Sequence, residues 1–220
     1  MINLVSIEKA TTEDIKKIVN LHSDGIRTGF LTSLGKEFLF ELYNFMINNR
    51  LGILLTAKNE NSDQVIGFIS ATYDCPKFYH GFLFSFSSLK SILIIIKHLL
   101  LNKKSKNNQK KKTSNLLNKL FRIYESLNYP NIRKHDLSSK AELLSIVVDQ
   151  KAQGSTISRQ LMDELKKKFA QNGISHFGVV VSPDNRRANA YYQKMGGVRV
   201  SDLEVHKGQT SNVFHIKTNS

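Results

Sequence analysis

The segment from Leu143 to Phe169 constrains the fold of this chain more than any other stretch. It opens with the run LLSIVV at 143–148, a nearly continuous apolar stretch of the kind that forms a strand covered on both faces. After Gly154, apolar residues recur at helical spacing, at Ile157, Leu161, Leu165 and Phe169. The segment therefore predicts a buried strand, a tight turn, and a helix over 154–171.

The turn between this strand and this helix predicts a binding site for phosphate. The first backbone N–H groups of a helix have no partner within the helix, and the helix dipole adds partial positive charge at the same end. A glycine lets a bound group approach the backbone closely, because it has no side chain. We therefore expect the amides of residues 151–156, around Gly154, to hold an anion. An ordinary strand-to-helix turn is the alternative reading of this glycine.

A second motif follows one helix and one strand later. Asn172-Gly173 predicts the end of the helix, and the apolar run 174–181 predicts another strand. The next segment, 182–197, reads SPDNRRANAYYQKMGG. Asp184-Asn185 within it is suited to cap a further helix.

Together the two motifs resemble those of the Gcn5-related N-acetyltransferase (GNAT) superfamily. The pyrophosphate loop of that family reads Gln/Arg-x-x-Gly-x-Gly/Ala. Here Gly154 matches the central glycine, with Lys151 and Thr156 at the flanking positions. The downstream family segment reads Asn-x-x-Ala-x-x-x-Tyr-x-x-x-Gly, and its four named positions are all matched, by Asn185, Ala188, Tyr192 and Gly196.

The resemblance implies an α/β fold of GNAT type, in which helices flank a mixed β-sheet that is splayed at its centre. The pattern agrees with a single acetyltransferase domain, 1–220, whose N-terminal half runs strand, helix, helix, strand, strand. We predict a loop at 22–32 and a helix capped by Ser33. The expected strands are 2–9, 52–57, 65–73, 143–148, 174–181, 198–206 and 212–217, and the N-terminal helices carry apolar positions within 15–21 and 38–46.

An insertion at 76–139 precedes the central strand and carries most of the positive charge. Residues 78–135 hold twelve Lys/Arg and one acid, which leaves only +3 of the net charge of +14 to the rest of the chain. Apolar spacing predicts two helices, over 89–100 and 116–127, joined by a lysine-rich loop at 102–113. The insertion is therefore expected to be helical.

Three readings of this insertion stay open. We favour the one in which its helices pack on the domain, or on a second copy of it in a homodimer, with the lysines in solvent. In the second reading, residues 78–127 make a peripheral contact with an anionic membrane surface. Nucleic-acid binding is least expected, because the lysines lack interleaved aromatic residues that could stack on bases.

Composition narrows the class of protein further. The single cysteine, Cys75, excludes an internal disulfide and is typical of a reducing compartment. The histidines are scattered without paired ligand spacing, so no metal is expected. The N-terminal residues turn polar too early for a secretory signal. We therefore expect a cytoplasmic protein, located at the inner face of the membrane if the insertion binds lipid.

The resemblance implies acetyl-CoA as the co-substrate and gives the two motifs their roles. Backbone amides of the loop 151–156 would bind the pyrophosphate, with the Lys151 ammonium as an added charge. The end of the preceding strand would bind the pantetheine arm. A helix cap is the alternative role of Asn185. The residues expected at the cofactor are Val147, Val148, Lys151, Ala152, Gln153, Gly154, Ser155, Thr156, Asn185 and Ala188.

Two residues are the candidates for proton transfer, which amide formation from a thioester requires. Tyr192 matches the residue that commonly protonates the departing thiolate in this superfamily, and an amphipathic aromatic residue with a satisfied hydroxyl is its alternative. Glu142 is the best candidate for the base, because strict alternation would place it on one face with Leu144, Ile146 and Val148. An exposed position at the start of the strand is the alternative for Glu142.

The acceptor is expected beside the loop 22–32 and the insertion, with His22, Asp24, Arg27 and Phe30 as candidate contacts. The predicted function is acetyl transfer to a primary amine of a small molecule, and an amino sugar or a lipid-linked acceptor would suit a membrane location. One rival function is a non-catalytic acyl-CoA-binding or scaffold protein of the same fold. The other is a membrane- or nucleic-acid-associated module that acts through the basic insertion.

Overall fold

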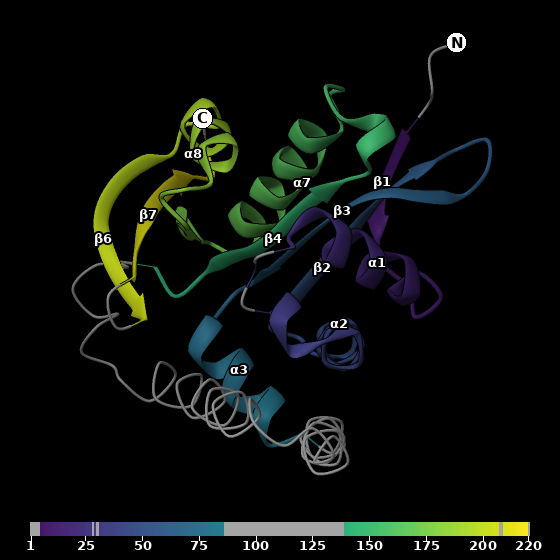
Figure 1. Cartoon of the computed structure of the whole chain (residues 1–220), viewed down its shortest axis with the longest axis horizontal. Coiled ribbons are helices and arrows are strands. Elements are labelled where there is room, and N and C mark those ends of the chain that lie inside the picture. Colours follow the sequence, from purple (N-terminus) through teal and green to yellow (C-terminus); the bar gives the residue numbers. More distant parts are fainter. Residues whose placement is uncertain (1–4, 28, 30, 86–138, 207–208, 220) are drawn as a thin grey trace, which may run out of the picture.

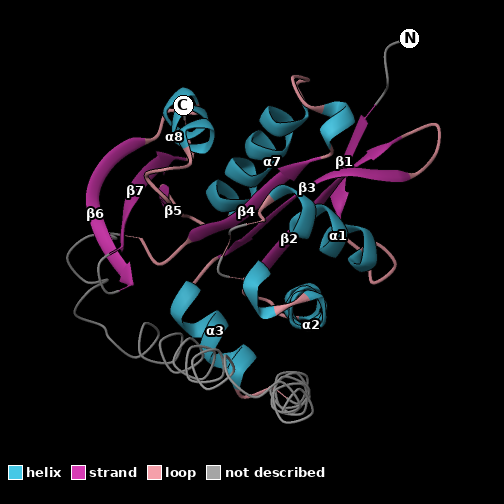
Figure 2. Ribbon diagram, viewed as in Figure 1, coloured by secondary structure: helices cyan, strands magenta, loops and turns pink. Residues whose placement is uncertain are grey.

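The computed structural model describes residues 5–27, 29, 31–85, 139–206 and 209–219. Helices flank a central twisted sheet (Figures 1 and 2). In the described part of the chain this sheet has seven strands in the order β1-β2-β3-β4-β5-β7-β6. Neighbouring strands are antiparallel except β4 and β5, which are parallel. The strands are β1 (Val5–Lys9), β2 (Gly52–Asn59), β3 (Gln64–Thr72), β4 (Glu142–Val148), β5 (His176–Val181), β6 (Val198–His206) and β7 (Gln209–Lys217).

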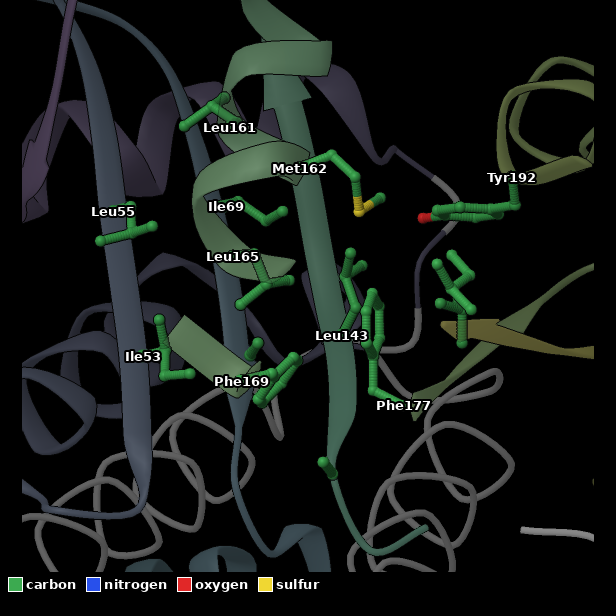
Figure 3. Close-up of a cluster of buried hydrophobic side chains, with 14 of the residues drawn as sticks. Ile53, Leu55, Ile69, Leu143, Leu161, Met162, Leu165, Phe169, Phe177 and Tyr192 are labelled. Atoms are coloured by element: carbon green, nitrogen blue, oxygen red, sulfur yellow. The ribbon is translucent and has the colours of Figure 1, made fainter. Parts of the chain in front are cut away.

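Two clusters of buried side chains cover the opposite faces of this sheet. Successive residues of β3 point to different clusters. Phe68 packs with helices α1 (Ile15–Gly25) and α2 (Lys36–Asn48), whereas Ile69 packs with α7 (Ile157–Gln171). Figure 3 shows the second cluster, to which α8 (Arg186–Lys194) adds Tyr192. The mixed, helix-flanked α/β fold expected from the sequence is confirmed.

Strand β4 carries a bulge at Leu144. Ser70 of β3 pairs with Ser145 of β4, and Ala71 pairs with Leu143, so Leu144 is an extra residue without a partner in the β3 ladder. A bulge bends its strand and increases the local twist. The direction of β4 therefore changes at this residue.

Beyond the bulge, β4 parts from β5. Among the described residues, the two strands pair only at Glu142 with Gly178 and at Leu143 with Val179. The rest of β4, residues 144–148, has no ladder with β5 along that edge. The sheet is splayed at its centre, as the resemblance implied.

Two predictions in the N-terminal half are wrong. The predicted loop 22–32 is partly helical, because α1 continues through Gly25 and a 3-10 helix covers Thr32–Leu34. The His22 side chain is buried against the sheet, which extends the apolar face of α1 by another turn. Ser33 lies inside the 3-10 helix and does not cap α2, which starts after Gly35 with φ of +98°.

The helix predicted at 154–171 ends where expected but starts later. Its end is fixed by Gly173, with φ of +72°, and by a hydrogen bond of 3.0 Å from the Ile174 amide to the Phe169 carbonyl. A 3-10 turn at Gln150–Ala152 takes up the start of the predicted segment, so α7 begins at Ile157. The predicted strand boundaries differ from the observed ones by three residues or fewer where the structure describes them.

The beginning of the insertion forms helix α3 (Cys75–Leu83). The Asp74 side chain caps it by accepting a hydrogen bond of 3.1 Å from the Lys77 amide. Phe78 and Phe82 are buried in the cluster of α1 and α2, so these two aromatic side chains are not available to a membrane surface. The amide of Cys75 donates to the carbonyl of Lys140 at 2.8 Å, which places the two positions that flank 76–139 side by side.

The helices predicted at 89–100 and 116–127, and the lysine-rich loop between them, lie outside the described residues. The readings of the insertion therefore stay predictions. None of the helices in the described ranges combines the length and the apolar character needed to cross a bilayer.

A buried ion pair joins the first helix to the sheet. The Lys58 ammonium of β2 lies 3.2 Å from the Asp14 carboxylate at the start of α1, and both side chains are at most 9% exposed. The same ammonium lies 3.6 Å from Asp63, whose side chain is 85% exposed. Asp14 also accepts a hydrogen bond of 2.8 Å from the Thr11 amide. One lysine thus has a buried and an exposed carboxylate partner.

Asp14→Asn should destabilise the fold by about 3 kcal/mol, because it leaves the buried Lys58 charge without its close partner while an oxygen remains to accept from Thr11. Asp63→Asn is the matched control and should cost about 0–1 kcal/mol, because water already screens that carboxylate. Urea unfolding at pH 7 measures both. Equal losses would contradict this account of the pair.

Candidate functional site

The candidate site lies where β4 continues past the end of its pairing with β5. Val147 is buried under α1: a Cβ placed on Gly25 would lie 2.6 Å from its Cγ1 atom, so the helix backbone rests directly on this strand. Val148 is half-buried on the α7 side. Both predicted pantetheine-binding positions therefore lie on the unpaired part of β4. Their backbone groups along the β5 side are not used by a strand ladder.

The loop 149–156 follows directly and is held by its own hydrogen bonds. The Asp149 carboxylate accepts from the Lys151 amide at 3.1 Å. The Ser155 hydroxyl donates to the Ala152 carbonyl at 2.6 Å. These bonds fix the backbone of the loop while the side chains of residues 153–156 remain exposed.

Gly154 turns this loop outward with φ of +84°, a conformation that glycine adopts without strain. Within the described ranges of the chain, the amides of residues 154–156 donate to no acceptor. The amides of Ser158 and Arg159 lie in the first turn of α7, where no helix carbonyl stands four residues earlier to accept their hydrogen bonds. Free amides at the positive end of a helix dipole form a site for an anion.

The late start of α7 adds residues that the sequence analysis missed. The family pattern Gln/Arg-x-x-Gly-x-Gly/Ala can also be aligned two positions later, with Gln153 at its first position and Thr156 and Ser158 in place of the glycines. In that register the last two positions coincide with the observed start of the helix. Testing every alignment of the family pattern against the expected start of the helix could have found these residues.

Helix α8 docks against this loop and brings a second cation to it. The Arg187 guanidinium donates to the Gln153 side-chain oxygen at 2.9 Å, and the Tyr191 hydroxyl donates to the Ser158 carbonyl at 2.8 Å. Arg187 thus joins Lys151 as a positive charge at the loop, although the sequence analysis gave it no role. The two sequence motifs are in contact in the fold.

Asn185 and Ala188 lie at the start of α8, where the structure shows a capping role. The Asn185 side chain accepts a hydrogen bond of 3.1 Å from the Ala188 amide. Asn185 is exposed and Ala188 is half-buried. Contact of either residue with a cofactor stays a prediction.

Tyr192 extends from α8 into the cluster shared with α7, with its hydroxyl directed toward Met162 (Figure 3). Its side chain is buried, at 6% exposure, and its ring lies 6.1 Å from the ring of Phe214. Burial raises the pKa of Tyr192, so the phenol keeps its proton at neutral pH. Proton donation to a thiolate stays a prediction.

Glu142 is buried at 8% exposure and pairs with Thr72, so it is not a surface residue. The face predicted for it is partly wrong. The bulge at Leu144 reverses the alternation, so Ile146 and Val148 pack with the α7 cluster while Glu142 points to the opposite face. A carboxylate at the start of the unpaired strand keeps its place as a candidate base.

The three acceptor candidates that the structure describes are not brought together. His22 is 1% exposed and faces the sheet from α1. Asp24 and Arg27 are exposed on the other side, where the Arg27 side chain donates to the Asp24 carbonyl at 3.3 Å. Phe30 lies outside the described residues. His22 is therefore a buried residue, whereas Asp24 and Arg27 lie on the surface.

His22 belongs to a buried polar network on the face that Glu142 shares. Its Nδ1 atom lies 2.6 Å from the Tyr43 hydroxyl, and its ring stacks on Phe68. The Ser145 and Ser70 side chains lie near the Tyr43 hydroxyl and offset part of the rise in its pKa that burial causes. Burial lowers the pKa of His22 from 6.5 to about 4, so the imidazole is neutral at pH 7 and is a weak base.

The other features of the described residues point to no second chemical centre. A surface groove of about 410 Å³ runs between α1 and α2, lined by Lys16, Val19, Asn20, Lys36, Glu37, Phe40 and Glu41. It includes none of the predicted site residues. No group of three or more His, Cys, Asp or Glu side chains in the described ranges could hold a metal ion.

The low pKa of His22 predicts a pH dependence of stability. The imidazole binds its proton near pH 6.5 when unfolded and near pH 4 when folded, so its contribution is complete above 6.5 and is lost as the pH falls toward 4. The loss should be about 3 kcal/mol. His22→Leu should remove this part of the slope, measured as the difference between the urea-unfolding free energies of the two proteins from pH 7 to 4. Parallel curves would rule out a buried, neutral histidine.

A family comparison agrees with this geometry. Residues 123–197 match the acetyltransferase (GNAT) family, and the matched stretch includes β4, the loop, α7 and α8. Among curated proteins, none matches the chain.

Solved structures share the fold at low sequence identity. SsHAT has a TM-score of 0.67 and 14% identity, over 98% of this chain and 99% of that chain. A PaiA N-acetyltransferase from Thermoplasma acidophilum in complex with coenzyme A has a TM-score of 0.57 and 15% identity, over 97% of this chain and 99% of that chain. NAA60 of Arabidopsis thaliana in complex with acetyl-CoA has a TM-score of 0.57 and 13% identity, over 99% of this chain and 100% of that chain. Residues 123–197 thus match the acetyltransferase (GNAT) family, and the described chain shares its fold with solved N-acetyltransferases.

Proposed function

We propose that this protein is an acetyl-CoA-dependent N-acetyltransferase that acts on a primary amine of a small molecule. One observation carries the proposal: the free amides of residues 154–156 lie directly beyond the unpaired edge of β4. A diphosphate bound by the loop would place an attached arm along that edge. Similar proteins in complex with coenzyme A and with acetyl-CoA support the choice of co-substrate.

The charge of the loop suits a diphosphate. Amides aimed at an anion from a helix start are already oriented, so binding requires little rearrangement. Lys151 and Arg187 add two cations at the rim, and the hydrogen bond of Arg187 to Gln153 keeps its guanidinium beside the loop. The backbone of β4 would then bind the amides of the pantetheine arm as a strand would.

The reaction needs two proton transfers around one bond exchange. The amine nitrogen attacks the thioester carbonyl carbon, the C–N bond forms, and the C–S bond breaks. Glu142 would take the proton of the amine, directly or through water; its burial where β4 begins to leave β5 supports this role. Tyr192 would return a proton to the thiolate. Because burial raises its pKa, Tyr192 is protonated at neutral pH and has a proton to give.

A thiol-release assay with acetyl-CoA and a panel of small primary amines tests the function. We expect the wild type to release CoA with at least one amine, and Glu142→Gln to slow the release by about 10²–10⁴-fold if Glu142 is the base. Binding of acetyl-CoA by calorimetry without release from any amine would favour the non-catalytic rival. No binding at all would overturn the proposal.

Gly154→Ala tests the loop itself. Gly154 and Gly173 both have positive φ, +84° and +72°, and open space around an added Cβ, so alanine should cost each about 1–2 kcal/mol of stability. Gly173 lies at the other end of α7 and is the matched control. Gly154→Ala should weaken CoA binding about tenfold, because the strained loop no longer aims its amides together. Gly173→Ala should bind CoA like the wild type, and equal affinities for all three proteins would contradict the site.

A further inference from the structure

The buried network of His22, Tyr43, Ser70 and Ser145 joins four elements at one point. His22 comes from α1, Tyr43 from α2, Ser70 from β3 and Ser145 from β4. The Tyr43 hydroxyl lies at the centre, 2.6 Å from His22 Nδ1. The Ser145 and Ser70 side chains lie close enough to it to offset part of the rise in its pKa that burial causes. All four residues are at most 4% exposed. In the described part of the chain His22 Nε2 has no hydrogen-bond partner, so the His22 ring is held by its Nδ1 bond and by packing. Buried polar contacts of this kind restrict the relative positions of their members.

The network includes the residues of β3 and β4 that lie at the bulge. Ser145 directly follows Leu144, the extra residue of β4, and Ser70 is the residue that pairs with Ser145 across the ladder. The Ser70 hydroxyl also lies 3.5 Å from the Ser145 carbonyl. A bulge is a weak point of a sheet, because its extra residue makes no ladder bonds. Here Tyr43 of α2 lies beside that weak point, and His22 of α1 bonds Tyr43.

We propose that this network is a positioning device that holds the bulge of β4 and thereby keeps the strand apart from β5. Tyr43 and Ser145 act on the reaction through the strand and do not touch the reacting atoms. The inference rests on the proposed function for its consequence, because the unpaired edge of β4 is where the pantetheine arm would bind. It does not involve the phosphate loop, which lies at the other end of β4 from the bulge.

Contacts around the network support a mechanical role. His22 stacks on Phe68 at 6.2 Å between ring centroids, with the planes 21° apart, and Tyr43 meets the same ring edge-on at 5.6 Å. Phe68 pairs with Val147, two residues beyond Ser145. The last turn of α1 rests on Val147 at Gly25. Polar and apolar contacts thus both involve the short stretch of β4 from Ser145 to Val147.

The test separates the strand from the loop by using two probes. CoA contacts both parts, whereas ADP carries the diphosphate without a pantetheine arm. Tyr43→Phe and Ser145→Ala each remove one hydroxyl from the network. We expect each variant to bind CoA about tenfold more weakly than the wild type and to bind ADP, measured as a competitor of CoA, with unchanged affinity. Amide hydrogen exchange of residues 144–147 should become faster in both variants.

Thr56→Val is the matched control. Thr56 is fully buried on the neighbouring strand β2, pairs with Phe68, and has a hydroxyl oxygen without a hydrogen-bond partner in the described part of the chain. Its removal should leave CoA binding and exchange unchanged. Equal CoA affinity of wild type and both network variants would overturn the inference, and so would a parallel loss for CoA and ADP. A wild type that binds neither probe would instead refute the proposed function.

Discussion

The architecture of the site depends on a backbone constraint: β4 and β5 share only two residue pairs in the described sheet. Had the parallel ladder continued, the edge of β4 would be closed by β5, and no arm could bind to it. The extra residue at Leu144 accounts for the change, because a bulge bends its strand away from a neighbour. The lost ladder bonds leave backbone groups that need other partners. A ligand with amides of its own suits such an edge.

The site is assembled from segments that are short on their own but fixed by packing. Helix α7 is anchored on the sheet by Leu161, Leu165 and Phe169, which are fully buried, so its N-terminal amides have a stable position. Helix α8 is tied to the same end through Tyr191 and Arg187. Rigid supports of this kind let a mobile acyl carrier be held without a costly closure of the protein around it.

Much of the fold could be predicted from the sequence, because most strands and helices follow from the spacing of apolar residues that are close in the chain. The apolar run at 143–148 and the helical spacing after Gly154 gave the central strand and helix, and four matched positions gave the second motif. Long-range effects could not be predicted. A bulge has no composition of its own, so strict alternation put Glu142 on a face with Ile146 that it does not share. The same holds for His22, which resembles a loop histidine in the sequence and becomes a core residue only through Tyr43 and Phe68.

The hydrogen bond from the Cys75 amide to the Lys140 carbonyl has a consequence for how this protein can vary. Because the two flanking positions already meet, the sheet does not depend on the length of the chain between them. The entropy of closing a connection rises by only about 0.6 kcal/mol for each doubling of its length. Residues could therefore be gained or lost between α3 and β4 while the sheet keeps its geometry.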